Sequence, residues 1–311
     1  MNIQGKPRRP LKLFLDYWAL VHLLEDGSWA SHKDRLMAYC KNGDCTLVLT
    51  IWHVFEILQY GDKVRAKKRY VHLEELRKEV PCLWIRLRTE LQRDEIAEAF
   101  FQAEGVDYKR KEIFYDEPVA LIPNSEKASW FGQARRDGLL WFFNKPELFK
   151  KFQQGQSNYP VTKLDIRHAR ENLVGHKEAI SKSQTQYVNG LVPTLYPSGL
   201  VIAEETKRKF LLRCPIDQFP SVYVETLLSE ETNKDTKSSP KKSDLVDMQH
   251  IVSALPYVEI AVLDGQFCNY ASIIRNKWKS SWPLAEPFSS IEAAFNRVEQ
   301  LVGGKGKEHN D

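Results

Sequence analysis

The sequence predicts an α/β fold, in which a parallel β-sheet is flanked by helices and interrupted by a large, mostly helical insertion. Residues 1–90 alternate apolar strand patterns with helical patterns, which is typical of parallel strands joined by helical crossovers. A further apolar, β-branched run at residues 258–263 is typical of a buried strand. The residues between these two regions show helical patterns but no strand rhythm.

Three short apolar runs in the first region are predicted strands, at residues 11–15, 46–50 and 83–87. The first is followed by a helical pattern that begins near Tyr17, because leucines and a valine recur there at helical spacing. The second is followed by a short helical pattern and then by a basic helical stretch over residues 63–79. Strands and helices therefore alternate up to the end of the third strand.

The middle of the chain, residues 91–243, is predicted to be an insertion into this α/β domain. Its most helix-like stretches are residues 96–102 and the aromatic-rich residues 129–144. Residues 190–199 carry the Pro and Gly residues of turns. Residues 229–243 are rich in Ser, Thr, Lys and Glu and poor in apolar side chains, so we expect a mobile linker there.

The predicted domain is thus assembled from two parts, residues 1–90 and residues 244–311, the second of which ends in a C-terminal helix. A chain of 311 residues, 42% hydrophobic and 28% charged, has the composition of a globular protein and can bury a substantial core. Its net charge of +4 permits a polyanionic partner but does not require one.

The sequence does not resemble that of a secreted or membrane protein. The basic N-terminus is followed by an apolar stretch that Asp16 and His22 interrupt, so it does not form a signal peptide. No run approaches the length of about eighteen apolar residues that a membrane span needs. The five cysteines are scattered without a C-x-x-C pair, which is typical of reduced thiols. We therefore predict a cytoplasmic protein.

Five acidic residues are predicted to meet near the carboxyl edge of the sheet. Asp16 and Asp264 each end a predicted strand, the place where open α/β sheets keep their sites. Glu56 lies on the helical pattern after the second strand. Asp244 and Asp247 are three residues apart and therefore share one face of a predicted helix. We take all five as candidate metal ligands and catalytic residues.

The chemistry of such a cluster follows from its charge. Carboxylates held close together repel one another and raise each other's pKa values unless a cation neutralises them. Mg²⁺ or Mn²⁺ suits hard oxygen ligands best. With a substrate phosphate also bound, these ions can activate water for in-line attack and offset the charge on the leaving oxygen. The predicted reaction is hydrolysis of a phosphodiester.

Each acid also has a purely structural interpretation. Asp16 could be a helix cap and Asp264 a turn residue. Glu56 could be an exposed acid on an amphipathic helix, and Asp244 could simply offset a helix dipole. The common position of Asp16 and Asp264 at strand ends favours a functional role for both, and we rank Asp247 above Asp244 as a ligand.

The order of these motifs resembles that of the PIN-domain nucleases, which include the ribonuclease toxins of bacterial toxin–antitoxin systems. The family's first motif, an apolar strand that ends in Asp, is similar to Leu13-Phe-Leu-Asp16. Its second, Thr-x-x-x-x-x-Glu before a nearby Gly, is similar to the run from Thr50 to Glu56 with Gly61. The resemblance implies a PIN-like (Rossmann-like) sheet and a Mg²⁺- or Mn²⁺-dependent nuclease that prefers RNA.

The later motifs of the family resemble residues near the end of the chain. Its helical Asp is similar to Asp247, with Asp244 as the neighbouring candidate, and its strand-end Asp is similar to Asp264. The Asp-x-x-His that ends at His250 and the Pro-Tyr after it resemble a bacterial PIN-like subgroup. We interpret His250 as a hydrogen-bonded neighbour of the ligands. The resemblance leaves the insertion unexplained, and the chain is longer than the small toxins.

Basic residues provide a second prediction, because Lys and Arg side chains can bind the phosphates of a nucleic acid. The run from Lys67 to Arg69 is explained equally well as a solvated helix face, whereas Arg86 and Arg88 end the third strand near the predicted site. Further basic runs of the insertion could grip a single strand together with its aromatic residues. They are Lys109 to Lys111, Arg135 and Arg136, and Lys207 to Lys209.

Two alternatives to a nuclease remain open at this stage. A catalytically silent PIN-like protein that binds nucleic acid or a protein partner predicts at least one acid turned away from the others. A phosphatase of the haloacid-dehalogenase type needs a second acid two residues after Asp16, where Trp18 stands. The insertion could select the substrate, dock a protein partner or a second copy of the chain, or inhibit the site.

Overall fold

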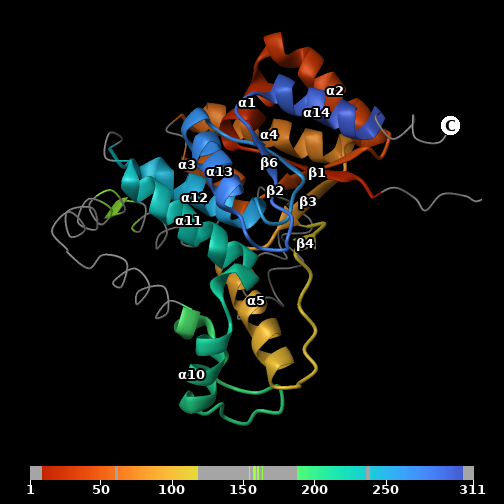
Figure 1. The fold of residues 1–311 in the computed structure, drawn as a ribbon. Helices are drawn as coiled ribbons and strands as arrows, with labels where there is room; N and C mark the ends of the chain where they lie inside the picture. Colours follow the sequence, from red (N-terminus) through yellow and green to blue (C-terminus); the bar gives the residue numbers. More distant parts are fainter. Residues whose placement is uncertain are drawn as a thin grey trace, which may run out of the picture.

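The structure, a computed structural model, describes residues 9–59, 62–117, 154, 157–158, 160, 163, 188–235 and 239–303. In this part of the chain a six-stranded sheet is covered by helices on both faces (Figure 1). The aromatic-rich pattern at residues 129–144, which includes Arg135 and Arg136, lies outside the described residues.

The sheet is mostly parallel, which confirms the predicted α/β class. Its strand order is β4-β3-β2-β1-β5-β6. The central strand β1 pairs in parallel with β2 on one side and with β5 on the other, and β4 alone among these six strands runs antiparallel to its neighbour. The strands are β1 (Leu11–Leu15), β2 (Cys45–Leu49), β3 (Cys82–Ile85), β4 (Phe114–Tyr115), β5 (Ile260–Val262) and β6 (Glu286–Phe288).

Alternate residues of the central strands face two separate cores. Leu13 lies in register with Leu47 and Ile260, and all three belong to the core on one face of the sheet. Phe14 lies in register with Val48, and both belong to the core on the other face. Strands that are apolar on both sides are expected where helices cover both faces of a parallel sheet.

The helices divide into two layers. Helices α1 to α4 and α14 contribute to the first core, and α5, α11, α12 and α13 contribute to the second. The helices are α1 (Tyr17–Glu25), α2 (Ala30–Lys41), α3 (Ile51–Gln59), α4 (Lys63–Glu79), α5 (Arg88–Ala103), α10 (Glu204–Arg213), α11 (Pro220–Lys234), α12 (Lys242–Ala254), α13 (Gly265–Lys277) and α14 (Ile291–Gly303).

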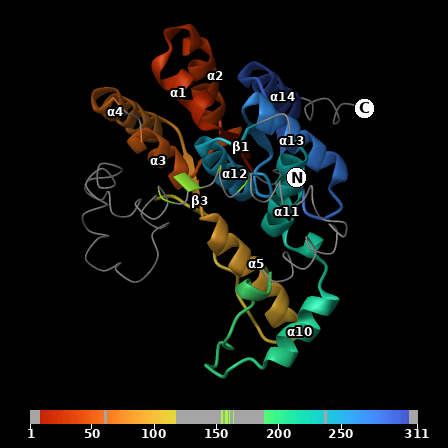
Figure 2. The same cartoon turned by 90° about the vertical axis from the view of Figure 1, so that its left-hand side faces the viewer.

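A smaller lobe formed by α5 and α10 extends away from the sheet (Figures 1 and 2). It has its own apolar cluster, in which Phe100 of α5 packs with Phe210 of α10 and with Phe219. Helix α11 connects this lobe to the main body, because Val222 belongs to the lobe's cluster and Val224 to the core under the sheet.

Both ends of the predicted mobile linker, residues 229–243, lie in helices. Helix α11 continues to Lys234 and α12 already begins at Lys242. The helix persists because Leu227 and Leu228 anchor it in the core and because Glu231 accepts hydrogen bonds from Lys234 and from Lys277 of α13. The insertion boundary drawn at residue 91 also falls inside α5.

None of the helices in the described part of the chain combines the length and the apolar character needed to cross a bilayer.

Candidate functional site

The sequential order of the strands reverses on either side of β1. Strands β2 and β3 follow on one side, and β5 and β6 lie on the other. Ligands of open α/β sheets bind beyond the carboxyl ends of the strands at such a switch point. Asp16 directly follows β1, and Asp264 comes two residues after β5. The Asp264 N–H lies 3.4 Å from Asp16 Oδ2, so the two acids flank the switch point together.

Asp16 and Asp264 are both N-caps of the helices that follow them. One oxygen of Asp16 accepts the Tyr17 N–H at 2.8 Å, and one oxygen of Asp264 accepts the Phe267 N–H at 2.8 Å. The caps hold each side chain in place while leaving each carboxylate a second oxygen. The structural role anticipated for Asp16 is therefore compatible with metal ligation.

Helices α3 and α12 bring Glu56 and Asp247 to the same place. Burial raises the pKa of Asp16, and the charges of Glu56 and Asp264 raise it further. Burial also raises the pKa of Asp247, and the other three carboxylates add to that rise. The pKa of Glu56 is raised to about 8 by burial. The four acids from separate segments therefore converge at the carboxyl edge of the sheet.

Asp244 lies at the margin of this cluster. It occupies the first turn of α12 and accepts the Lys241 N–H at 2.9 Å. Its charge also raises the pKa of Asp247, but as the smallest of the contributions named. This position fits the helix-terminal role, and it keeps Asp247 as the better of the two ligand candidates.

The donor chemistry of the cluster fits a hard divalent cation. In the described part of the chain, no Lys or Arg forms an ion pair with any of the four converging carboxylates. When these carboxylates are ionised, their negative charge therefore has no basic counterpart there. No group of three or more His, Cys, Asp or Glu side chains among the described residues is placed closely enough to be a ready-made metal site. The carboxylates would have to move closer together to coordinate a cation.

Two buried histidines and a threonine link the segments that carry the acids. His53 Nε2 lies 2.8 Å from the carbonyl oxygen of Leu15, and His53 Nδ1 accepts the Thr50 N–H at 3.0 Å. The Thr50 hydroxyl lies 2.8 Å from His250 Nδ1. His250 Nε2 lies 3.0 Å from Glu56 Oε2. We name this chain of contacts the histidine relay.

One assignment of protons satisfies every contact of the histidine relay. His53 donates from Nε2 to the strand carbonyl, and Thr50 donates its hydroxyl proton to His250. His250 then donates from Nε2 to Glu56, which orients that carboxylate. The relay thereby ties together the end of β1, the start of α3 and the middle of α12.

Both histidine rings of the relay are buried, with centroids 4.5 Å apart, and Phe14 packs against both. Burial lowers the pKa of His53 well below its usual value, and it lowers the pKa of His250 to about 4. The rings are therefore neutral near neutral pH. In this state His250 supports Glu56 by a hydrogen bond, and His53 bonds the backbone of Leu15 and Thr50.

Sequence patterns assign no role to His53. The signal for it is nevertheless present, because a His follows Thr50 by three residues and another His follows Asp247 by three residues. Each spacing is close to one helical turn. These two sequence spacings predict the hydrogen bonds of the histidine relay only when it is known that α3 and α12 face each other.

We expect His250→Phe to weaken Mn²⁺ binding by roughly 10- to 100-fold, because partners that orient metal ligands typically contribute that much. The ring packing is retained, while the hydrogen bonds to Thr50 and Glu56 are lost. Titration calorimetry measures the affinity, and circular dichroism checks the fold. A matched control is His32→Phe, since His32 packs on Trp29 and bonds Glu292 outside the site. Equal affinities in the two variants would contradict the role of the relay.

Most of the basic residues predicted to bind phosphates are engaged elsewhere. Arg86 is buried and bonds Asp94, and Arg88 bonds Glu225. Acids of α5 and α11 therefore neutralise Arg86 and Arg88, so the structure lends no support to the prediction that these two residues bind phosphates. Arg69 is also buried, whereas Lys67 and Lys68 are exposed on α4.

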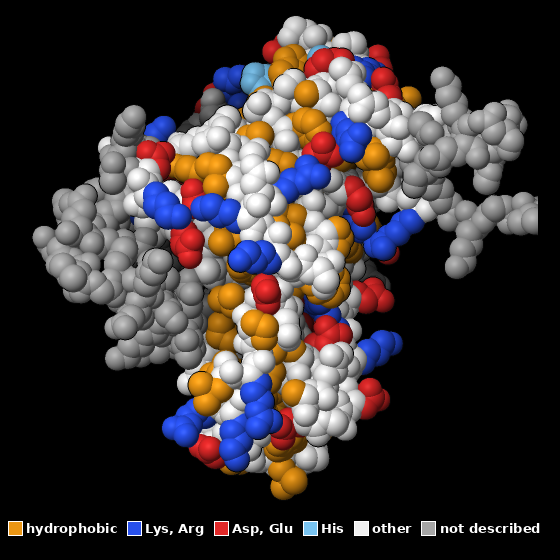
Figure 3. All heavy atoms as spheres, in the orientation of Figure 1, with side chains coloured by type: hydrophobic (Ala, Val, Ile, Leu, Met, Phe, Trp, Pro, Cys, Tyr) orange, Lys and Arg blue, Asp and Glu red, His pale blue; other side chains and the backbone are white. Residues whose placement is uncertain are grey.

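The basic runs of the predicted insertion are also largely paired. Arg110 contacts Glu95 and Glu98, both at 3.7 Å. Lys207 bonds Glu204, and Arg208 and Lys209 both contact Glu205. On the face shown in Figure 3, basic and acidic side chains are interspersed. That face therefore carries no broad basic surface.

Comparisons of the chain with protein-family models, with curated proteins and with solved structures found no match.

Proposed function

We propose that this chain is a PIN-like, metal-dependent nuclease that hydrolyses phosphodiester bonds, with RNA preferred over DNA. The observation that carries the proposal is the convergence of Asp16, Glu56, Asp247 and Asp264 at the switch point of the sheet. The preference for RNA rests on the family resemblance of the sequence motifs.

The four converging acids are the residues that would hold Mg²⁺ or Mn²⁺, with Asp244 in reserve at the margin. When bound, the metal would activate water and offset negative charge on the phosphodiester. The protein's own contribution is to hold the acids in place. The helix caps orient Asp16 and Asp264, and the histidine relay orients Glu56.

A catalytically silent nucleic-acid-binding or protein-binding relative is the alternative. It predicts that at least one acid points away from the cluster. The mutual effects of the four carboxylates on the pKa values of Asp16 and Asp247 favour the nuclease instead.

The proposal is tested with purified protein and end-labelled RNA and DNA in Mn²⁺, in Mg²⁺ or in chelator. We expect cleavage that requires a divalent cation and that is lost in Asp264→Asn. Asn retains the Oδ1 that caps α13 but removes the carboxylate charge. Cleavage that persists in chelator, or that persists in the variant, would reject the assigned site.

A further inference from the structure

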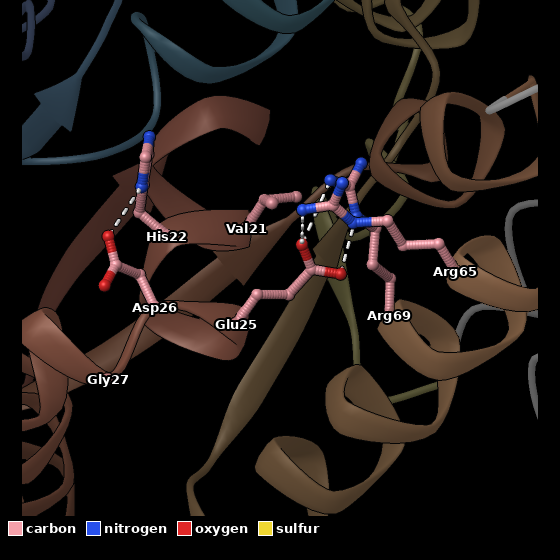
Figure 4. Close-up of a pocket in the computed structure, with 7 residues that line it drawn as sticks. All are labelled: Val21, His22, Glu25, Asp26, Gly27, Arg65 and Arg69. Carbon is pink, nitrogen blue, oxygen red and sulfur yellow. Dashed lines mark hydrogen bonds and ion pairs between the residues drawn. The ribbon is translucent and has the colours of Figure 1, made fainter. Parts of the chain in front are cut away.

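A pocket of about 370 Å³ lies between the C-terminal part of α1 and the first turns of α4 (Figure 4). Its walls carry His22, Glu25 and Asp26 from the end of α1 and Arg65 and Arg69 from α4. Volumes of this order are typical of small-ligand sites. None of the four converging acids lines this pocket.

The two arginines of the pocket differ in their exposure and in the length of their ion pairs with Glu25. Arg69 is 8% exposed and donates to both carboxylate oxygens of Glu25, at 2.8 and 3.0 Å. Arg65 is 54% exposed, and its ion pair with Glu25 is longer, at 3.5 Å. More than half of the Arg65 side chain is therefore open to solvent, where a phosphate can approach it, while Arg69 neutralises Glu25. Asp26 is satisfied locally, because it caps the turn at Ser28 and contacts His22 at 3.6 Å.

His22 lines the pocket with an imidazole ring that two tryptophans support from outside the pocket. The His22 ring is stacked on Trp29, with centroids 4.9 Å apart and planes inclined by 20°. Trp18 packs edge-on against both rings. The His22 side chain is 48% exposed, so its ring is accessible while Trp29 and Trp18 fix its plane. A flat, supported ring of this kind is a platform on which an unpaired base can stack.

Tyr17 connects the pocket with the acids. Its hydroxyl accepts a hydrogen bond from Arg69 at 2.8 Å, and its backbone N–H donates to Asp16. Burial raises the pKa of Tyr17, and Glu56 is near enough to add to the rise. Tyr17 therefore lies between Arg69 of the α1–α4 pocket and Asp16 of the candidate site.

We propose that the α1–α4 pocket binds one nucleotide of a single-stranded nucleic acid, with Arg65 on a backbone phosphate and His22 stacked on the base. The inference rests on the proposed function, because it places this nucleotide on the same strand as the bond that the acids cleave. A base within a duplex is already stacked and paired, so the pocket selects single strands.

The test measures the affinity of labelled single-stranded RNA, single-stranded DNA and duplex RNA by fluorescence anisotropy. All proteins carry Asp264→Asn to prevent cleavage. Arg65→Gln is compared with Arg208→Gln, which removes the same charge from an exposed arginine that is ion-paired to Glu205 on α10. His22→Ala is compared with His22→Phe, which restores an aromatic ring.

We expect Arg65→Gln to bind single strands several-fold more weakly than Arg208→Gln, with the slope of log affinity against log salt reduced by about 0.7. His22→Ala should weaken single-strand binding by at least about fivefold, and His22→Phe should restore it. Duplex binding should not change between the two His22 variants. If the substitutions weaken the binding of single-stranded RNA and DNA equally, the pocket recognises features that both strands share. If they weaken only the binding of RNA, the pocket recognises a strand that contains ribose.

Equal affinities for Arg65→Gln and Arg208→Gln would overturn the phosphate assignment. An unchanged affinity in His22→Ala would overturn the base assignment. These outcomes are separate from the proposed function. If the wild-type chain cleaves neither RNA nor DNA but its binding of single strands still depends on Arg65 and His22, the proposed nuclease activity is rejected and the proposed nucleotide pocket is retained.

Discussion

Asp16→Asn is expected to reduce metal-dependent cleavage by on the order of 10²–10³-fold, the usual loss when one preorganised group is removed from a reacting centre. The fold should be retained, because Asn keeps the oxygen that accepts the Tyr17 N–H and caps α1. The loss should therefore come from the missing charge at the switch point. Single-turnover rates at saturating Mn²⁺ measure the effect.

The matched control for this variant is Asp34→Asn, which makes the same change on the exposed surface of α2. We expect its cleavage rate to equal that of the wild-type chain. The role assigned to Asp16 fails if the two variants cleave at similar rates, or if Asp16→Asn loses its cooperative thermal unfolding along with its activity.

Asp247→Asn is expected to stabilise the metal-free protein while removing its stabilisation by Mn²⁺. The pKa of Asp247 is raised in the folded chain, so the folded state keeps a proton that the unfolded state releases. The free energy of unfolding therefore falls as pH rises from the unfolded pKa toward the folded one. Asn carries no charge and avoids this loss.

Near pH 8 in chelator, the gain in the free energy of unfolding for Asp247→Asn should be roughly 1–2 kcal/mol, and it should shrink toward about pH 4. Thermal melts across this pH range measure it. At about 100-fold excess over the dissociation constant, Mn²⁺ should stabilise the wild-type chain by about 2.7 kcal/mol. It should stabilise the variant much less. A variant that is less stable than wild type at every pH would contradict the electrostatic account.

The features predicted well are those whose signal is local. The first strand matches β1 at both ends, and the basic helical stretch matches α4. The strand at residues 258–263 contains β5, because a continuous β-branched run has few other interpretations. The positions of Asp16 and Asp264 follow from these strands, since parallel strands end at the same edge of a sheet.

The features that sequence patterns missed depend on tertiary contacts. Strands β4 and β6 have only two and three residues, too few for a periodic signal, and they exist because β3 and β5 offer free edges. Arg86 looks available in the sequence, but the acid that neutralises it, Asp94, lies two turns along α5. The spacing of His53 from Thr50 gains meaning only from tertiary structure, because its other partner is the Leu15 carbonyl at the end of β1.

The position of β5 has a consequence for biosynthesis. Strand β1 is synthesised long before β5, so one of its two edges is completed only when residues 260–262 arrive. Asp247 and Asp264 also follow Asp16 and Glu56 by a long stretch of chain. A nascent chain that stalls between these segments carries only Asp16 and Glu56, so the four acids can come together only after residue 264 has been synthesised.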